Sequence, residues 1–133
     1  MATLICRIMG PVFIFIALWG FIAGDRVLIF HVNPAHNWVH LISGVLALWA
    51  GFSNERFAKN FCLAFGSVYG LVAILGFARF EPVIEALHLN MADNWLHLIL
   101  SIVFLVGAFV QRPVRFGMHG PRGRTPPHPT PMG

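Results

Sequence analysis

The chain has 133 residues, of which 57% are hydrophobic and only 11% are charged. A soluble domain typically has about 25% charged residues, so this composition argues against an ordinary soluble protein and favours a single domain built from membrane spans. The net charge of +4 comes from basic residues at segment ends and in the C-terminal tail rather than from one face with stacking aromatics, which argues against a nucleic-acid partner.

The first apolar segment extends from Leu4 to Gly24 and is interrupted only by Arg7. Its length, and the apolar segments that follow it, favour an anchor that stays in the protein over a cleaved signal peptide. At about 1.5 Å per residue, such a helix is long enough to cross a hydrocarbon core of roughly 30 Å. We therefore predict that this segment is the first membrane span.

Further apolar segments lie at about residues 35–52, 61–78 and 91–110. Asn33 and Asn90 stand just before the second and fourth segments, where their side chains are expected to cap the helix N-termini. The predicted fold class is therefore all-α, a bundle of four transmembrane helices.

The connections between these segments differ in charge. The connections at 25–32 and 79–89 contain two basic residues, Arg26 and Arg79, whereas the other side contains both termini and a polar turn at 53–60. The basic residues on that other side are Arg7, Arg56, Lys59, Arg112, Arg115, Arg122 and Arg124. Because basic residues concentrate on the cytoplasmic side, we predict a multi-pass protein of the bacterial cytoplasmic (inner) membrane with both termini in the cytoplasm.

The composition changes after Gln111, where arginines alternate with glycine and proline. Such a segment buries too little apolar surface to fold by itself. The predicted domains are therefore a four-helix membrane domain at 1–111 and a flexible, basic, Pro/Gly-rich cytoplasmic tail at 112–133.

One polar signature occurs twice. Asn-Pro-Ala-His-Asn-Trp-Val-His-Leu at 33–41 returns as Asn-Met-Ala-Asp-Asn-Trp-Leu-His-Leu at 90–98, at a constant offset of 57 positions. The first and third apolar segments also align, at an offset of 56 that pairs Cys6 with Cys62. We interpret the chain as two parallel two-helix repeats, about 4–53 and 60–110, related by a pseudo-two-fold axis along the membrane normal.

The doubled signature, together with the Gly-Phe pair near the end of the first and third segments, resembles a bacterial family of small four-helix membrane proteins known as domain of unknown function 4383. The resemblance covers about Gly10 to Val110. It implies a four-helix integral membrane protein, and it brings no established activity.

Residues three and four apart share a helix face, so the signature predicts two polar stripes. The first contains Asn33, His36, Asn37, His40 and Gly44, and the second contains Asn90, Asp93, Asn94, His97 and Ser101. One interpretation is a polar latch, in which Asn33, Asn37, Asn90 and Asn94 join the two hairpins at their outer ends. In that case Asp93 closes a capping box at its helix N-terminus.

Two other interpretations give the stripes a ligand. His36, His40, Asp93 and His97 are two i, i+4 pairs that suit zinc, or iron if coordination positions stay open. Alternatively, if the second and fourth helices are diagonal, His40 and His97 could hold a flat tetrapyrrole between them, either haem or a chlorophyll-type pigment. Gly44 and Ser101, one turn deeper, would then make room for the macrocycle.

No phosphate-binding loop, Gly-x-Ser-x-Gly or His-Glu-x-x-His motif occurs, so the sequence points away from an enzyme, and Cys6 and Cys62 are interpreted as small packing residues. We expect a non-enzymatic accessory or structural subunit of a larger membrane complex. Its partners would be the bilayer and other membrane subunits or further copies of itself. The alternatives are a metal- or tetrapyrrole-binding membrane protein and, third, a membrane enzyme that uses such a metal.

Overall fold

The computed structural model of the protein describes residues 1–110, and the predicted tail at 112–133 lies outside them. The described part is helical, with two very short strands. Its elements are α1 (Ala2–Ala23), β1 (Arg26–Val27), β2 (Phe30–His31), α2 (Pro34–Phe52), α3 (Glu55–Phe77), α4 (Glu81–Leu87) and α5 (Met91–Phe109). The all-α prediction is confirmed at this level.

Three helices among the described residues are long and apolar enough to cross a membrane, namely α1, α3 and α5. The fourth long helix, α2, has 19 residues. It is less apolar because its first two turns contain His36, Asn37 and His40. The polar signature therefore lowers the hydropathy of one of the four predicted spans.

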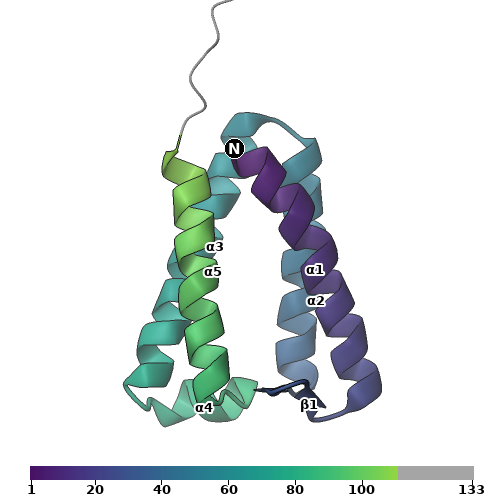
Figure 1. The fold of residues 1–133 in the computed structure, drawn as a ribbon, viewed down its shortest axis with the longest axis vertical. Coiled ribbons are helices and arrows are strands. Elements are labelled where there is room, and N and C mark those ends of the chain that lie inside the picture. Colours follow the sequence, from purple (N-terminus) through teal and green to yellow (C-terminus); the bar gives the residue numbers. More distant parts are fainter. Residues whose placement is uncertain (111–133) are drawn as a thin grey trace, which may run out of the picture.

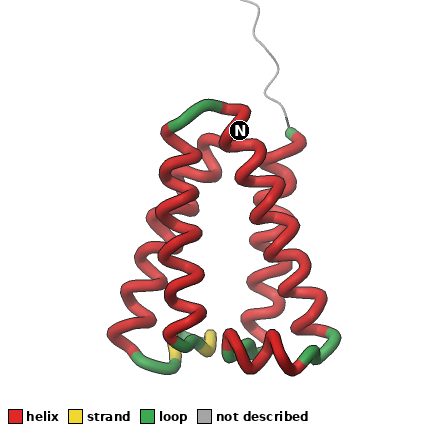
Figure 2. The backbone as a smooth tube through the Cα atoms, turned by 180° about the vertical axis from the view of Figure 1, so that it is seen from behind, coloured by secondary structure: helices red, strands yellow, loops and turns green. Residues whose placement is uncertain are grey.

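The long helices form two antiparallel hairpins, α1 with α2 and α3 with α5 (Figure 1). The hairpins approach each other at the end that contains the N-terminus and the α2–α3 turn, and they diverge toward the end that contains β1 and α4. Figure 2 shows the same shape from behind. We call the converging end the apex and the diverging end the outer end.

The α2–α3 turn is shorter than predicted. We expected a polar turn at 53–60, but α3 already begins at Glu55. The side chain of Asn54 accepts a hydrogen bond from the backbone N–H of Phe57 at 2.9 Å and so caps the helix. The polar residues after this cap are good helix formers and extend the apolar helix at its N-terminus.

Both outer connections contain structure that the sequence did not predict. At 25–32, β1 and β2 form a small antiparallel pair, in which Arg26 lies opposite His31. At 79–89, α4 begins after Phe80 with a proline in its first turn, and it ends at His88 in the left-handed conformation. These two elements lie across the outer end of the bundle (Figure 1).

The core changes in character along the bundle. At the apex, Ala2, Cys6, Ala58 and Cys62 are fully buried, and the two cysteine sulfurs are 3.6 Å apart. These small side chains let α1 and α3 approach closely. Nearer the outer end, large rings from three helices fill the wider space, and the polar stripes lie beyond them.

Candidate metal centre

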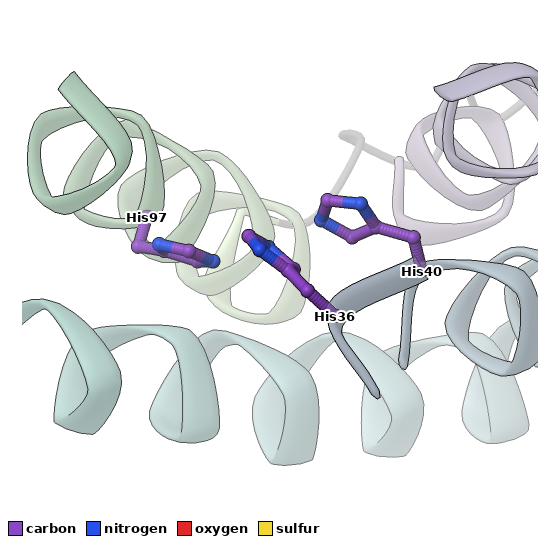
Figure 3. A group of neighbouring side chains, drawn as sticks. All are labelled: His36, His40 and His97. Carbon is purple, nitrogen blue, oxygen red and sulfur yellow. The ribbon is translucent and has the colours of Figure 1, made fainter. Parts of the chain in front are cut away.

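Three histidines meet in the interior of the bundle. His36 and His40 come from α2 and His97 comes from α5, and one ring nitrogen of each lies within 4.8 Å of the others. Figure 3 shows the three rings in a row with His36 in the middle. All three side chains are buried, with exposed fractions of 2%, 4% and 3%. The structure thus brings together three of the four residues predicted as metal ligands.

The ring nitrogens of these histidines lack protein partners. Within residues 1–110, no hydrogen bond is found for either ring nitrogen of His36, nor for Nδ1 of His40 or His97. A buried polar atom without a partner is rare, because it gives up its hydrogen bonds to water and gains none in return. The converging, unpartnered nitrogens therefore make this cluster a candidate ligand site.

Helix capping determines where the α2 histidines lie. Asn33 accepts a hydrogen bond from the backbone N–H of His36 at 2.8 Å, which makes His36 the third helical residue. His40 follows one turn later, so both rings lie on the face toward the interior. The ring centroids of His36 and His40 are 4.5 Å apart.

Asp93 lies at the same helical position of α5 but has a different role. Its Oδ2 accepts hydrogen bonds from the backbone N–H of Asn90 at 2.9 Å and of His31 at 3.3 Å. Asn90 in turn accepts from the N–H of Asp93, which completes a capping box. Among the described residues, the group with converging ligand atoms does not include Asp93, which was predicted as its fourth member.

The two capping asparagines also join the hairpins. Asn33 Nδ2 donates to the carbonyl of Ala86 in α4, and Asn90 Nδ2 donates to the carbonyl of Ile29 in the β1–β2 turn, each at 2.9 Å. Each asparagine therefore caps its own helix and bonds the outer connection of the other hairpin. These reciprocal bonds position the outer ends of α2 and α5 and with them the histidines.

Asn37 and Asn94 lie elsewhere. We expected them to bond to the neighbouring hairpin, but each contacts a glycine of its own hairpin. The side chain of Asn37 packs so closely against Gly20 that a Cβ atom on Gly20 would overlap it. Asn94 packs against Gly76 in the same way. They therefore fasten α2 to α1 and α5 to α3, whereas Asn33 and Asn90 connect the hairpins.

Gly44 and Ser101 also face their own hairpins. Gly44 lies against the carbonyl of Gly10 and the side chain of Ile14 in α1. Ser101 donates a hydrogen bond to the carbonyl of Gly66 in α3 at 2.7 Å. These residues allow close helix packing and do not open space between the hairpins, where a macrocycle would have to lie.

Aromatic rings cover the histidines on the apex side. Phe13 stacks on His40 with centroids 5.6 Å apart, and Tyr69 stacks on His97 at 5.5 Å. Phe104 packs against both of these rings. Neither Phe13 nor Tyr69 was predicted as part of the site, because Phe13 is one of thirteen phenylalanines and Tyr69, the only tyrosine, stands in an apolar helix outside the doubled signature.

The geometry suits a small ion. Zinc binds imidazole nitrogens at about 2.0–2.1 Å, which places ligand nitrogens roughly 3.4 Å apart in a tetrahedral site. Reaching that spacing from 4.8 Å requires a shift of about 1.4 Å, within the range of side-chain rotation. A flat tetrapyrrole between His40 and His97 would instead have to displace the ring of His36 (Figure 3).

Within residues 1–110, these features define a helical protein with three helices that are long and apolar enough to cross a membrane, and with a buried histidine cluster. The family model described as "Domain of unknown function (DUF4383)" matches residues 4–110, so the chain belongs to this family, as its doubled signature indicated. No curated protein and no solved structure matches the chain.

Proposed function

We propose that this chain is a membrane protein that binds one transition-metal ion through His36, His40 and His97. The observation that carries the proposal is the convergence of three buried imidazoles, with no hydrogen bond within residues 1–110 for both ring nitrogens of His36 and for Nδ1 of His40 and His97. Three neutral imidazoles without a thiolate suit zinc, iron, copper or nickel rather than magnesium or calcium. Three protein ligands also leave a coordination position for a further molecule, as in catalytic zinc sites.

The proposed setting is a bundle in which all four long helices span the bacterial cytoplasmic membrane, with both termini in the cytoplasm. The lower hydropathy of α2 fits this setting, because its polar residues face the interior and its outward residues are apolar. Trp38 and Trp95 are more than half exposed near the outer end, where tryptophan suits the membrane interface. Corresponding contacts in the two hairpins favour a pseudo-two-fold axis along the membrane normal.

The test is metal analysis of the full chain purified in detergent. We expect about one equivalent of metal per chain after mild purification. After removal by chelation, cobalt(II) should restore a visible ligand-field band. Substituting His36, His40 or His97 by alanine should lower cobalt affinity more than 100-fold, since ligand loss costs more than the 10–100-fold typical of an outer-shell partner.

His88→Asn is the matched control. His88 lies in the outer connection in a left-handed conformation that asparagine tolerates, and it is not part of the cluster. This variant should bind cobalt like the unmodified chain. If His88→Asn and His36→Ala lost cobalt affinity equally, the loss would be due to general destabilisation. A folded, unmodified chain that binds no cobalt would refute the metal site.

The alternative is the accessory or structural subunit expected from the sequence. The hydrogen bonds of Asn33 and Asn90 favour it, because they join the hairpins without any ligand. A colourless, metal-free chain that co-purifies at fixed stoichiometry with another membrane protein would support this role. The metal proposal predicts instead that the metal stays with the isolated chain.

A further inference from the structure

A side pocket of about 250 Å³ reaches the histidine cluster from the surface of the bundle. Four residues of α1 and four of the segment 27–32 line it, together with residues of α2 and α5. Of the three clustered histidines, His36 and His97 are among the lining residues, and Asp93 lies beside them. The pocket is therefore a route to the cluster that does not pass through the apex or through the aromatic layer.

The pocket lies between α1, α5 and the segment 27–32, where Leu28 is 67% exposed. Val12, Phe15 and Trp19 of α1 lie along it and are 40%, 62% and 38% exposed. They occupy the middle and outer half of a helix that is long and apolar enough to cross a membrane. A molecule that enters between them comes from the hydrocarbon region of the bilayer rather than from water, because nearly all of the lining side chains are apolar.

At its inner end the pocket borders three polar side chains, His36, Asp93 and His97, which contribute little of its surface. Neither ring nitrogen of the buried His36 has a hydrogen-bond partner among residues 1–110. The hydrogen bonds that the Asp93 carboxylate accepts within the same range fall on Oδ2, which leaves Oδ1 free to accept another. An apolar channel that borders Asp93 at its inner end fits a molecule with a hydrocarbon body and one hydroxyl group.

We propose that this pocket binds a neutral, lipid-soluble alcohol, whose hydroxyl group donates a hydrogen bond to Asp93 and lies beside the metal. The proposal rests on the metal site above and assigns the class of molecule that approaches it. The volume is below the roughly 300–1,000 Å³ of typical ligand pockets, so only the hydroxyl end of a longer chain would enter.

Trp19 provides a direct reporter because it lines the pocket. The other three tryptophans, Trp38, Trp49 and Trp95, are more than half exposed and should tolerate phenylalanine. Replacing these three by phenylalanine leaves Trp19 as the single tryptophan. Its fluorescence is quenched when a bromine atom of a bound molecule lies near its indole ring. The probes are a long-chain alcohol brominated near its hydroxyl group and the alkane of equal length brominated at the same position.

We expect the alcohol to quench Trp19 saturably, with an affinity about tenfold above that of the alkane, since a hydrogen bond to a charged group contributes about 1.5–3 kcal/mol. Asp93→Asn retains an oxygen for the helix cap but loses the charge, and it should lower alcohol affinity about threefold or more. A second reporter, Leu75→Trp in a chain with Trp19→Phe, places the indole at the corresponding position of α3. It should show only non-saturable quenching.

The same samples are analysed for metal, which separates the two proposals. Normal metal content with equal, non-saturable quenching by alcohol and alkane would overturn the pocket and leave the metal site standing. Saturable quenching that prefers the alcohol, in a chain that binds no metal, would overturn the metal site and support the pocket alone. Saturable quenching of the Leu75→Trp reporter would also overturn the pocket, because binding would then not be confined to its side of the bundle.

Discussion

The hairpins α1–α2 and α3–α5 make matching contacts at several positions and differ at one that matters for the site. Asn33 and Asn90 cap their helices and bond the opposite hairpin, and an asparagine packs on a glycine in each. At the third helical position, however, α5 has Asp93 and α2 has His36. The Asp93 carboxylate accepts a hydrogen bond from the backbone N–H of the capping residue Asn90. The His36 imidazole takes no part in the cap of its helix and lies in the interior.

The physical reason for this difference lies in the chemistry of the two side chains. A carboxylate at the third position of a helix is held by backbone N–H groups and by the helix dipole. A neutral imidazole at the same position has no such restraint, and here it faces His40 and His97. Buried atoms without a hydrogen-bond partner occur both at the matching asparagines, Asn37 and Asn94, and at the histidines, but only the histidine nitrogens converge.

The largest effect is expected from His36→Ala. At a metal concentration about 1,000-fold above Kd, metal binding should stabilise the unmodified chain by about 4 kcal/mol, and the variant should lose this increment. Its metal-free stability should fall by about 2 kcal/mol, because the cavity left by a buried ring is partly offset by the removal of its unpaired nitrogens. Unfolding in detergent, with and without zinc, measures both quantities. If zinc raised the free energy of unfolding of the variant as much as that of the unmodified chain, His36 would not be a metal ligand.

Gly20→Ala and Gly76→Ala test the matching contacts. A Cβ at either glycine overlaps the facing asparagine, so each variant should lose about 1–3 kcal/mol through overpacking. The measurement is the free energy of unfolding in detergent. The double variant Gly20→Ala with Asn37→Ala should recover part of the loss, since the overlapping side chain is gone. Additive losses in the double variant would show that the contact is not the cause.

Asp93→Ala is the counterpart of His36→Ala. It leaves the backbone N–H groups of Asn90 and His31 without their acceptor, at an expected cost of about 2 kcal/mol in metal-free stability. Cobalt affinity should stay within about threefold of the unmodified chain, because Asp93 is outside the converging group. A loss of cobalt as large as in His36→Ala would instead make Asp93 a ligand.

The smallest effects are expected for Asn33→Ala and Asn90→Ala. Each removes one cap and one bond to the other hairpin, with an expected cost of about 1 kcal/mol or slightly more. The two values should agree within about 0.5 kcal/mol if the hairpins are equivalent at this position. Replacement by aspartate, which keeps the cap but lacks the amide donor, separates the two contributions in the same unfolding assay.

The sequence predicted the features that depend on local chemistry. The caps at Asn33 and Asn90 and the capping box of Asp93 occur as expected, because they are formed within one helical turn. The start of α3 was misplaced because Glu55, Arg56 and Lys59 are polar, and polarity alone does not end a helix. Periodicity therefore located the apolar part of this helix but not its first turn and a half.

Short elements that form only when distant segments pack together were not predicted from the sequence. The strands β1 and β2 have two residues each, too few for any alternating pattern to be detected. Helix α4 has seven residues and no buried one, so it lacks the apolar face that reveals a helix. The sequence also could not decide between capping and metal binding for His36 and Asp93, because that choice depends on which groups lie within reach after folding.

The shape of the bundle has a mechanical consequence. The hairpins meet at an apex packed with small residues, around Cys6 and Cys62, and the histidines lie about ten residues away along α5. At about 1.5 Å per residue this is a lever arm of roughly 15 Å, so a pivot of about 5° at the apex moves His97 by about 1.3 Å. That displacement is close to the contraction that metal coordination requires. Such a pivot would bring His97 closer to His36 and His40, which both belong to α2, and would displace α4 and the β1–β2 turn at the outer end.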